Sequence, residues 1–576
     1  MPQDAFTLKY LCNELNNVFS GGKVNRIVQP DNDEVVFTVY NGKKTERLYL
    51  NVNPASPRIG IATEERESPL TAPNFCMLLR KHLSAAMLDG ISLVGFDRIV
   101  KIDFTASGEF FDAVKKTVYV ELMGRYSNVI LTENGKILGG NRGINMFDDG
   151  VRPLIVGKPY VFPPVNGKKI PNDFSLIDYF SDYCGGGVPE YICAKVQGVA
   201  LSTAREAVLA FAEKTGVSYE DAERGFSEFA ESFFEFFKNF LFCASPSPCV
   251  ITDNDAVKDV CLFPYKTLKG DVIKFDSLYL AENYYYSEKM RVKKFNDKRE
   301  RLKNIINTSL KKIKKRLNAL NERQKDALSA EGNRVRGELI ISNIYRIEKG
   351  AAACTLENYY EGGQTVEILL DPRLSASENA QAYFKKYNKQ KRTLEAIVPQ
   401  KEQAESEYAY LESIADELSL AENLDDVNLI YSEARAAGLV NDKIPVRKEK
   451  VQTASFCRVY KIGGFTVRAG RNNTENDRLT ATAKPESMWL HAKDYHSSHV
   501  VIEYCDKPFT DDVIIKSAEI CAYYSKGRES GKTEIAYALK RNVKKPRKSK
   551  AGFWVYEEYK TAFVTADAHP ELLIGD

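Results

Sequence analysis

The feature that most constrains this chain is a long apolar repeat in its middle part. Between residues 289 and 325 apolar side chains recur at alternating spacings of four and three, at Leu302, Ile306, Leu310, Ile313, Leu317 and Leu320. This spacing is typical of a helix that presents one apolar seam to a partner helix. Residues 377–432 carry apolar side chains of the same kind, at Leu394, Ile397, Leu411, Ile414 and Leu418. A long pair of packed helices is therefore expected.

The charges of the two segments indicate how they pair. Residues 289–325 hold fifteen Lys and Arg against three Asp and Glu, whereas 401–426 hold nine acidic residues against one lysine. Opposite charge on two arms joined by a short insert predicts an antiparallel coiled coil over 276–440. The insert, about 330–376, is expected at the tip of this hairpin, with a strand at 365–370.

The remaining patterns predict an α+β multidomain protein, and its 576 residues allow about four folded units. Residues 1–175 are expected to form a β-rich domain, because 34–40 alternate apolar and polar, turn at Asn41-Gly42 and return through 47–52. Further strands are predicted at 92–104, 117–123 and 128–132. In the helix pair, Pro399 is expected to kink or interrupt the second arm.

Two more units complete the expected organisation. Residues 176–275 are predicted to be helical, and Gln197 to Ser202 resemble a loose helix-hairpin-helix, although an ordinary helical turn explains them equally well. Residues 445–576 are predicted to be an α/β domain. Its expected strands and single helix are 456–461, 465–468, 488–492, 499–504, the helix 511–526, 533–539, 553–556 and 562–565.

Composition excludes several classes of protein. Hydrophobic residues at 44% exclude wholesale disorder, and no apolar run approaches the roughly 18 residues of a membrane helix. Eleven scattered cysteines without a C-x-x-C pair indicate neither a disulfide frame nor a zinc site, but free thiols in the cytoplasm. No phosphate-loop motif is present, so an NTPase is not expected. The spacings of His491, His496 and His499 do not favour a metal site, and we expect no metal and no cofactor.

The densest chemical signal is a basic loop at 540–550, in which seven of eleven residues are basic and none is acidic. The basic residues are Lys540, Arg541, Lys544, Lys545, Arg547, Lys548 and Lys550. Not all of so compact a cluster is expected to be neutralised locally, and it suits a phosphate backbone, with a merely solvated loop as the alternative.

The Asp97-Arg98 pair is a second candidate site. A regular strand over 93–104 would place Arg98 among apolar side chains, so it must be paired or reach into a pocket. Asp97 would then point to the opposite face, and a structural salt bridge is the alternative reading. The next predicted strand ends at Glu121, and with Arg125 it supplies an acceptor and a forked donor beside the same surface.

One enzymatic alternative starts from Pro2. Removal of Met1 would expose the secondary amine that N-terminal-proline DNA glycosylases use as a nucleophile. However, Gln3 stands where those enzymes place a carboxylate, and there is no four-cysteine zinc finger. A glycosylase is therefore retained only as a rival hypothesis.

Taken together, the chain resembles the NFACT family of ribosome quality-control factors nearly from end to end. The matching motifs, in chain order, are Gly22-Lys23-Val24-Asn25-Arg26-Ile27, Gly95-Phe96-Asp97-Arg98, Glu121-Leu122-Met123-Gly124-Arg125-Tyr126-Ser127-Asn128, Glu378-Asn379-Ala380 with Phe384-Lys385-Lys386-Tyr387-Asn388-Lys389, Gly470-Arg471-Asn472-Asn473, Asn476-Asp477, Trp489-Leu490-His491, Ser498-His499-Val500-Val501 and Val543-Lys544-Lys545-Pro546. Several ordered motifs in one chain make the resemblance specific.

The resemblance implies an NFACT-N domain, a helix-hairpin-helix region, a coiled coil and an NFACT-R domain. It implies a cytoplasmic factor that binds the large ribosomal subunit with its peptidyl-tRNA, recruits alanyl-tRNA and supports mRNA-independent alanine tailing. The ribosome makes the peptide bond, so the protein itself is not expected to be an enzyme. By position, Asp97 and Arg98 become the tRNA-recognition pair, with Glu121, Leu122 and Arg125 on the same surface.

Two departures from the family pattern stand out. His496-Ser497 occupies the place where bacterial relatives usually have Pro-Gly, and the helix-hairpin-helix glycines are poor. An older label of the family, fibronectin binding, is the other rival hypothesis. It would require surface display, for which the sequence carries no signal or anchor motif.

Overall fold

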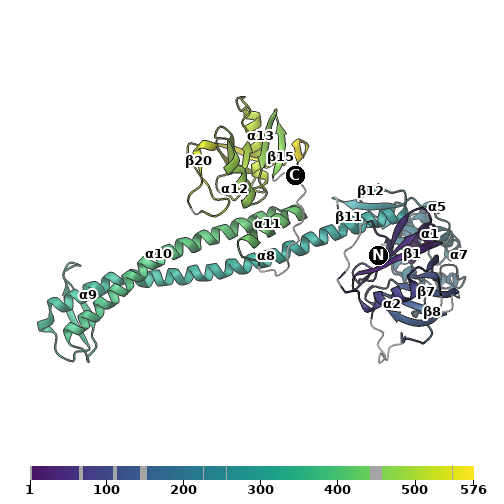
Figure 1. Ribbon diagram of the computed structural model, residues 1–576, viewed down its shortest axis with the longest axis horizontal. Coiled ribbons are helices and arrows are strands. Elements are labelled where there is room, and N and C mark those ends of the chain that lie inside the picture. The colour runs from purple at the N-terminus through teal and green to yellow at the C-terminus, as the bar shows by residue number, and fades with distance from the viewer. Residues whose placement is uncertain are drawn as a thin grey trace. The chain divides into compact units, whose positions relative to one another are not determined.

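The computed structural model describes residues 3–63, 69, 71–107, 113–142, 152, 154–165, 167–224, 226–254, 256–440, 457–547 and 549–575. They fall into two compact units, Met1–Arg291 and Val292–Asp576. The long helix α8 (Leu278–Leu328) begins in the first unit and continues into the second (Figure 1). No described helix combines the length and the hydropathy that crossing a membrane would require.

A nine-stranded antiparallel sheet dominates the first unit, in the order β4-β3-β2-β1-β5-β6-β7-β8-β9. Its strands are β1 (Gly22–Asp31), β2 (Glu34–Tyr40), β3 (Thr45–Asn51), β4 (Arg58–Ile61), β5 (Met87–Leu93), β6 (Ile99–Ser107), β7 (Ala113–Glu121), β8 (Asn128–Glu133) and β9 (Lys136–Gly140). The predicted Asn-Gly hairpin is confirmed, because Val39 pairs with Glu46 and Tyr40 with Thr45.

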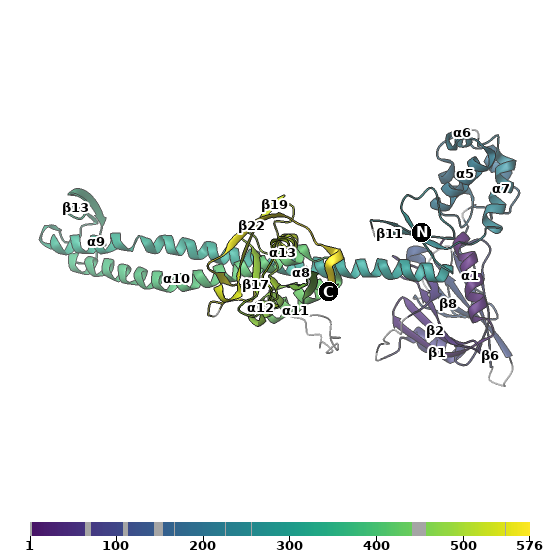
Figure 2. The same ribbon diagram turned by 90° about the horizontal axis from the view of Figure 1, so that it is seen from above.

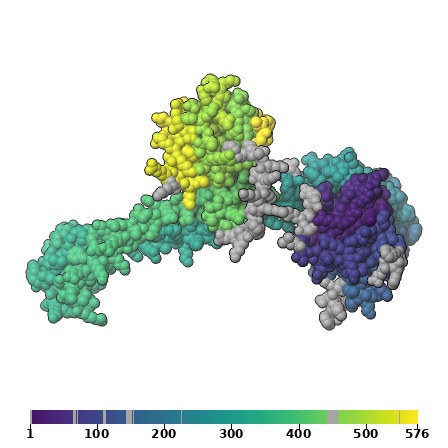
Figure 3. Space-filling view, viewed as in Figure 1, coloured from purple at the N-terminus to yellow at the C-terminus, as the bar shows by residue number. Residues whose placement is uncertain are grey.

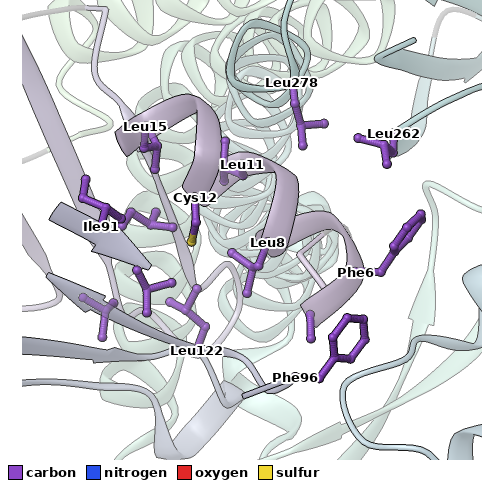
Figure 4. Packing of buried hydrophobic residues seen from close by; sticks show 14 of the residues in the cluster. Phe6, Leu8, Leu11, Cys12, Leu15, Ile91, Phe96, Leu122, Leu262 and Leu278 are labelled. Atoms are coloured by element: carbon purple, nitrogen blue, oxygen red, sulfur yellow. The ribbon is translucent and has the colours of Figure 1, made fainter. Parts of the chain in front are cut away.

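Helix α1 (Ala5–Phe19) is the centre of the core in this unit, and α2 (Asn74–Leu83) also packs against it. The buried residues of α1 lie between Ile91 of β5 and Leu122, which directly follows β7, on one side and Leu262 and Leu278 on the other (Figure 4). Buried aliphatic side chains contribute about 1.5–3 kcal/mol each. This packing fixes the base of α8 to the sheet.

The prediction of one strand over 92–104 is wrong. Residues 94–98 form a turn between β5 and β6, in which Gly95 has a φ of +57°. The apolar pattern misled because Phe96 is buried even though it lies in the turn. Arg98 therefore does not lie in the middle of an apolar strand face.

The prediction of a helical segment over 176–275 holds only to residue 242. Helices α3 (Leu176–Ser181), α4 (Val188–Lys195), α5 (Leu201–Thr215), α6 (Tyr219–Arg224) and α7 (Ala230–Phe242) are followed by a three-stranded sheet. Its strands are β10 (Cys249–Asp253), β11 (Ala256–Cys261) and β12 (Asp271–Lys274). The β-branched run Val250-Ile251-Thr252 favours a strand at this point.

Two long antiparallel helices form the arm of the second unit, α8 and α10 (Ala376–Leu420), which lie side by side in Figure 2. Leu302 and Ile306 pack with Ile414 and Leu418, whereas farther along the arm Leu320 packs with Ile397 and Ala404. Residue numbers rise along one helix as they fall along the other, as the charge pattern predicted. In the space-filling view the atoms of the arm form one unbroken surface (Figure 3).

Helix α10 continues through Pro399, so the expected interruption is not found. Buried residues on either side, Ile397 and Ala404, hold the helix against α8. The tip consists of α9 (Ala330–Ser342), β13 (Ala353–Asn358) and β14 (Gln364–Leu369), and α10 is followed by α11 (Leu424–Ala436). The predicted strand at 365–370 is thus confirmed within one residue.

The C-terminal part folds on a seven-stranded antiparallel sheet, in the order β22-β19-β17-β18-β16-β15-β23. Its elements are β15 (Arg458–Ile462), β16 (Phe465–Ala469), α12 (Asn473–Thr482), β17 (Met488–Ala492), β18 (Val500–Ile502), α13 (Asp511–Tyr523), β19 (Lys532–Leu539), β22 (Lys560–Thr565) and β23 (Leu573–Gly575), with β20 (Val543–Lys544) and β21 (Val555–Tyr556) as a separate pair. The predicted strands and the helix are confirmed within a few residues, whereas α12 and β23 were not predicted.

Candidate functional site

Asp97 and Arg98 lie in the turn between β5 and β6, where both side chains are half-buried. One carboxylate oxygen of Asp97 accepts a hydrogen bond of 2.7 Å from the Arg98 backbone N–H, and the other accepts one of 2.9 Å from the Gln197 side-chain amide. The Asp97 carboxylate is therefore held from two sides. It is bound to neutral donors and does not require a salt bridge with Arg98 to fix its position.

The loop that contains Gln197 packs closely against the turn at 94–98. Gly198 has a φ of +74°, and a Cβ atom there would lie 2.2 Å from the Phe96 carbonyl oxygen. The Gly198 carbonyl also accepts a hydrogen bond of 2.8 Å from the Ala5 backbone N–H. Only glycine combines this backbone conformation with so close an approach.

Asp4 lies in the same region, beside the start of α5, and was not predicted as a site residue. One of its oxygens caps α1 by accepting from the Thr7 N–H at 2.9 Å. The other accepts from the Ala200 N–H at 3.0 Å and from the Thr203 hydroxyl at 2.8 Å, and so holds the start of α5. An aspartate just before an apolar helix is a recognised N-cap signal, so the first of these contacts could have been predicted.

A cavity of about 440 Å³ opens beside the Asp97-Arg98 turn. Its lining includes Asp4, Asp97, Arg98, Met123, Lys168 and Gln197. The Lys168 ammonium is oriented by a hydrogen bond of 2.7 Å to the Cys193 carbonyl. A concave site with a guanidinium and an ammonium group suits an anionic or hydrogen-bonding ligand.

Glu121 and Leu122 were expected on the same surface, and this expectation is wrong. Glu121 is only 2% exposed, and its oxygens accept bonds of 3.0 and 2.6 Å from Arg152 and of 2.7 Å from the Tyr160 hydroxyl. Leu122 packs in the core. A buried carboxylate needs such partners, because an unpaired charge in the interior costs several kcal/mol. Burial, reinforced by the Glu121 charge, raises the pKa of Tyr160.

Arg125, by contrast, is exposed and lies 4.7 Å from the ring centre of Tyr126, which is itself 67% exposed. The turn that carries these residues adjoins the Asp97-Arg98 turn, because the Leu122 N–H donates a bond of 2.9 Å to the Arg98 carbonyl. The structure thus brings Asp97, Arg98 and Arg125 to neighbouring turns and places Met123 in the cavity.

In the basic loop at 540–550 two lysines have acidic partners, and Lys548 lies outside the described residues. Lys545 pairs with Asp477, which also accepts a bond of 3.0 Å from the Trp554 indole, and Lys544 lies 3.4 Å from Glu557. Two of the seven basic residues are therefore paired locally, which is compatible with the expectation that not all of them can be neutralised.

Of the other described cations of the loop, three are exposed and one is half-buried. Arg541, Arg547 and Lys550 are exposed. Lys540 is half-buried beside Trp554, it donates a bond of 3.2 Å to the Val543 carbonyl, and burial lowers its pKa. Because exposed pairs such as Lys544–Glu557 contribute about 0–1 kcal/mol, the loop still presents a positive surface.

Two of the three histidines, His491 and His499, lie close together and are packed inside the C-terminal domain, whereas His496 is exposed. The rings of His491 and His499 are 5.4 Å apart, and burial lowers the pKa of His491 to about 4 and that of His499 well below its usual range. Within the described ranges, no group of three or more His, Cys, Asp or Glu side chains is placed to hold a metal ion. In the turn where His496-Ser497 replaces the usual Pro-Gly of the family, the Ser497 hydroxyl accepts a hydrogen bond of 3.0 Å from the Ala492 N–H.

Pro2 lies outside the described residues, but its neighbour Gln3 is informative. The Gln3 amide is buried and bonds to both the N–H and the carbonyl of Ile59 at the edge strand β4. It also donates a bond of 2.5 Å to the buried carboxyl group of Glu282 at the base of α8. Gln3 therefore has a structural role in joining the sheet to α8.

Comparison with known proteins covers almost the whole chain. Residues 4–453 match the model of the NFACT N-terminal and middle domains, and residues 455–553 match that of the NFACT protein RNA binding domain. The Rqc2 homolog RqcH of Bacillus subtilis (strain 168) is 31% identical over 570 residues, which cover 97% of each chain. The protein of the same name from Streptococcus suis (strain 05ZYH33) is 28% identical over 573 residues, or 98% of each chain. Among solved structures, the fibrinogen binding protein from Staphylococcus aureus is 23% identical and matches 50% of this chain and 99% of its own, with a TM-score of 0.42.

Proposed function

Because this chain belongs to the NFACT family over residues 4–453 and 455–553, we propose that it is a ribosome quality-control factor of the cytoplasm. In this proposal it binds large ribosomal subunits that still carry peptidyl-tRNA, and it recruits alanyl-tRNA for mRNA-independent alanine tailing. Likeness over 97% of the chain to the Rqc2 homolog RqcH of Bacillus subtilis supports the assignment.

The observation that carries the proposal is the Asp97-Arg98 turn beside its cavity. Asp97 is fixed by Gln197 and by the Arg98 backbone, so the turn is pre-organised for a ligand. Arginine can fork to phosphate or base edges and can stack on unpaired bases, which is how proteins read the single-stranded parts of folded RNA. We assign tRNA recognition to Asp97 and Arg98, with Arg125 on the neighbouring turn.

A second surface, the basic loop at 540–550, would bind the RNA backbone. Its exposed cations, Arg541, Arg547 and Lys550, belong to the part of the chain that matches an RNA binding domain or directly adjoin it. Contacts of this kind release counterions and make binding depend strongly on salt. The α8–α10 arm would act as a coiled-coil spacer between the two surfaces and contribute to subunit binding.

The proposal assigns no catalytic residue and no cofactor to this chain, since peptide transfer is the ribosome's own activity. What the chain supplies is the selection and positioning of tRNA. Positioning alone can lower a barrier substantially, because it removes the entropy of bringing two reactants together.

The test is tailing in a reconstituted system of stalled large subunits, charged tRNA and purified protein. Arg98→Ala is expected to abolish tailing while leaving co-sedimentation with large subunits intact. The matched control is Arg224→Ala, an exposed arginine on α6, which should change neither. Normal alanine tails from Arg98→Ala would overturn the site, and a native protein that carries no ribosomal or transfer RNA would overturn the function.

A further inference from the structure

A second cavity, of about 410 Å³, lies next to the basic loop and has no role in the function proposed above. It is enclosed between α10 and residues 549–553. The residues that decide its chemistry are Glu405, Tyr410, Asn473, Lys550 and Phe553. Cavities of this size are typical of sites for small organic groups.

The cavity is aromatic and its walls are fixed. Tyr410 lies on α10, and its hydroxyl is held by a bond of 2.9 Å to Glu433 of α11. Phe553, three residues after Lys550, is 57% exposed. Two aromatic side chains thus border one concave space, and an exposed aromatic ring next to cations is a common feature of single-stranded RNA sites.

The backbone wall is equally well defined. Gly552 has a φ of +78°, and a Cβ atom there would lie 2.2 Å from the Asn473 side-chain oxygen. The Asn473 amide in turn donates a buried hydrogen bond of 2.9 Å to the Ser413 hydroxyl of α10. Gly552, Asn473 and Ser413 therefore form a fixed part of the cavity wall.

The charges around the cavity are asymmetric. On the loop side, the Lys550 ammonium lies 5.6 Å from the centre of the Tyr410 ring, and Arg547 is exposed nearby in sequence. On the helix side, Glu405 contributes a carboxylate. A phosphate is attracted to the first side and repelled by the second, so a bound nucleotide would direct its heterocycle toward α10.

We propose that this cavity holds one unstacked nucleobase of an RNA strand whose phosphates lie on the basic loop at 540–550. This inference rests on the proposed function and gives its second surface a specific ligand. The faces of Tyr410 and Phe553 supply the stacking surface. Glu405 accepts a hydrogen bond from an exocyclic amino group, which favours cytosine or adenine over uracil.

The experiment measures binding of the full-length protein to three single-stranded RNAs of equal length. One is oligocytidine, one is oligouridine, and one is an abasic ribose-phosphate strand. Wild type is expected to bind oligocytidine roughly 10- to 100-fold more tightly than the abasic strand, since stacking of one base is worth about 1–3 kcal/mol. Phe553→Ala should reduce this ratio to below about threefold, whereas Phe553→Tyr should keep it.

Two further variants separate the base from the backbone. Arg547→Ala should weaken binding to all three strands equally, and it should lower the slope of log affinity against log salt by about one. Glu405→Gln should bring oligouridine to within about threefold of oligocytidine, because an amide can both donate and accept. Phe553 is largely exposed, so Phe553→Ala should leave the melting temperature unchanged.

The outcomes distinguish this inference from the proposed function. Equal affinity of wild type for oligocytidine and the abasic strand would overturn the base site while leaving backbone binding in place. An equal loss on all strands in Phe553→Ala would also overturn it, because Phe553 would then support backbone binding and not a base. Failure to bind any RNA would count against the proposed function as well.

Discussion

The side-chain amide of Gln197 donates a hydrogen bond of 2.9 Å to the carboxylate of Asp97, although the two residues are 100 positions apart. Gln197 precedes α5, and Asp97 lies in a turn of the large sheet. Gly198 makes this approach possible, because a residue with a Cβ atom at this position would clash with the Phe96 carbonyl. The orientation of the proposed tRNA-recognition residue thus depends on a segment outside its own sheet.

The first prediction concerns this bond. Gln197→Ala should weaken tRNA binding roughly tenfold, because a hydrogen bond to a charged group is worth about 1.5–3 kcal/mol and is partly screened at a half-buried site. Gln197→Glu should be worse, because it places a second carboxylate against Asp97. Binding is measured by equilibrium titration with labelled tRNA.

The control for this prediction is a double-mutant cycle. Once Asp97 is replaced by alanine, Gln197→Ala should have little additional effect, because the two side chains act as a pair. Additive losses would mean that Gln197 acts independently of Asp97, and the positioning role would have to be abandoned.

The second prediction concerns Gly198. Gly198→Ala should destabilise the first unit by about 1–3 kcal/mol from backbone strain alone, with the contact at 2.2 Å adding to this loss. The control is Gly216→Ala at the end of α5, where φ is +75° but no atom lies within 4 Å. The two variants are compared by urea unfolding followed through fluorescence. Equal losses would show that strain matters and the close approach does not.

The third prediction concerns pH. Burial raises the pKa of Glu282 at the base of α8 to about 8, and the hydrogen bond from Gln3 opposes this only partly. Because the folded-state pKa is above the unfolded value of about 4.5, the unfolded chain loses its proton first as pH rises. The contribution of Glu282 to stability should therefore be greatest below pH 4.5 and should fall, by up to roughly 1.4 kcal/mol per pH unit, until about pH 8.

Glu282→Gln tests this, because it keeps an acceptor for Gln3 but cannot ionise. Its melting temperature should depend less on pH between 5 and 8 than that of wild type, and it should exceed wild type at pH 8. Glu300→Gln, an exposed glutamate on the same helix, serves as the control. If both variants follow the wild-type curve, Glu282 does not titrate in this range.

The fourth prediction concerns the Asp477 carboxylate, which binds both Lys545 and the Trp554 indole. Asp477→Asn should release Lys545 for contact with phosphate and raise the slope of log affinity against log salt by about one. Glu557→Gln is the matched control, because its pair with Lys544 is exposed and weak. An unchanged slope in Asp477→Asn would show that Lys545 does not reach the RNA.

Local pattern was sufficient for the long elements. The apolar spacing predicted the two helices, because it belongs to residues a few positions apart, and the opposite net charges of the two arms predicted their antiparallel direction. The hairpin of β2 and β3 and most C-terminal strands followed in the same way. Charge density identified the basic loop, and a charged pair in an apolar stretch identified Asp97 and Arg98, before any geometry was known; the family resemblance added their role in tRNA recognition.

Tertiary structure alone decided how these residues are used. The turn at 94–98 was invisible because the buried Phe96 continues the apolar pattern through it. The sequence predicted Glu121 as a surface acceptor, but in the structure it is bound by Arg152 and Tyr160, which lie 31 and 39 residues later in the chain. The hydrogen bond from Gln197 to Asp97 joins two residues 100 positions apart, and no local sequence pattern near either residue predicts it. Short-range periodicity records which face of an element is buried, but not which distant side chain will meet it there, because that depends on how the elements pack.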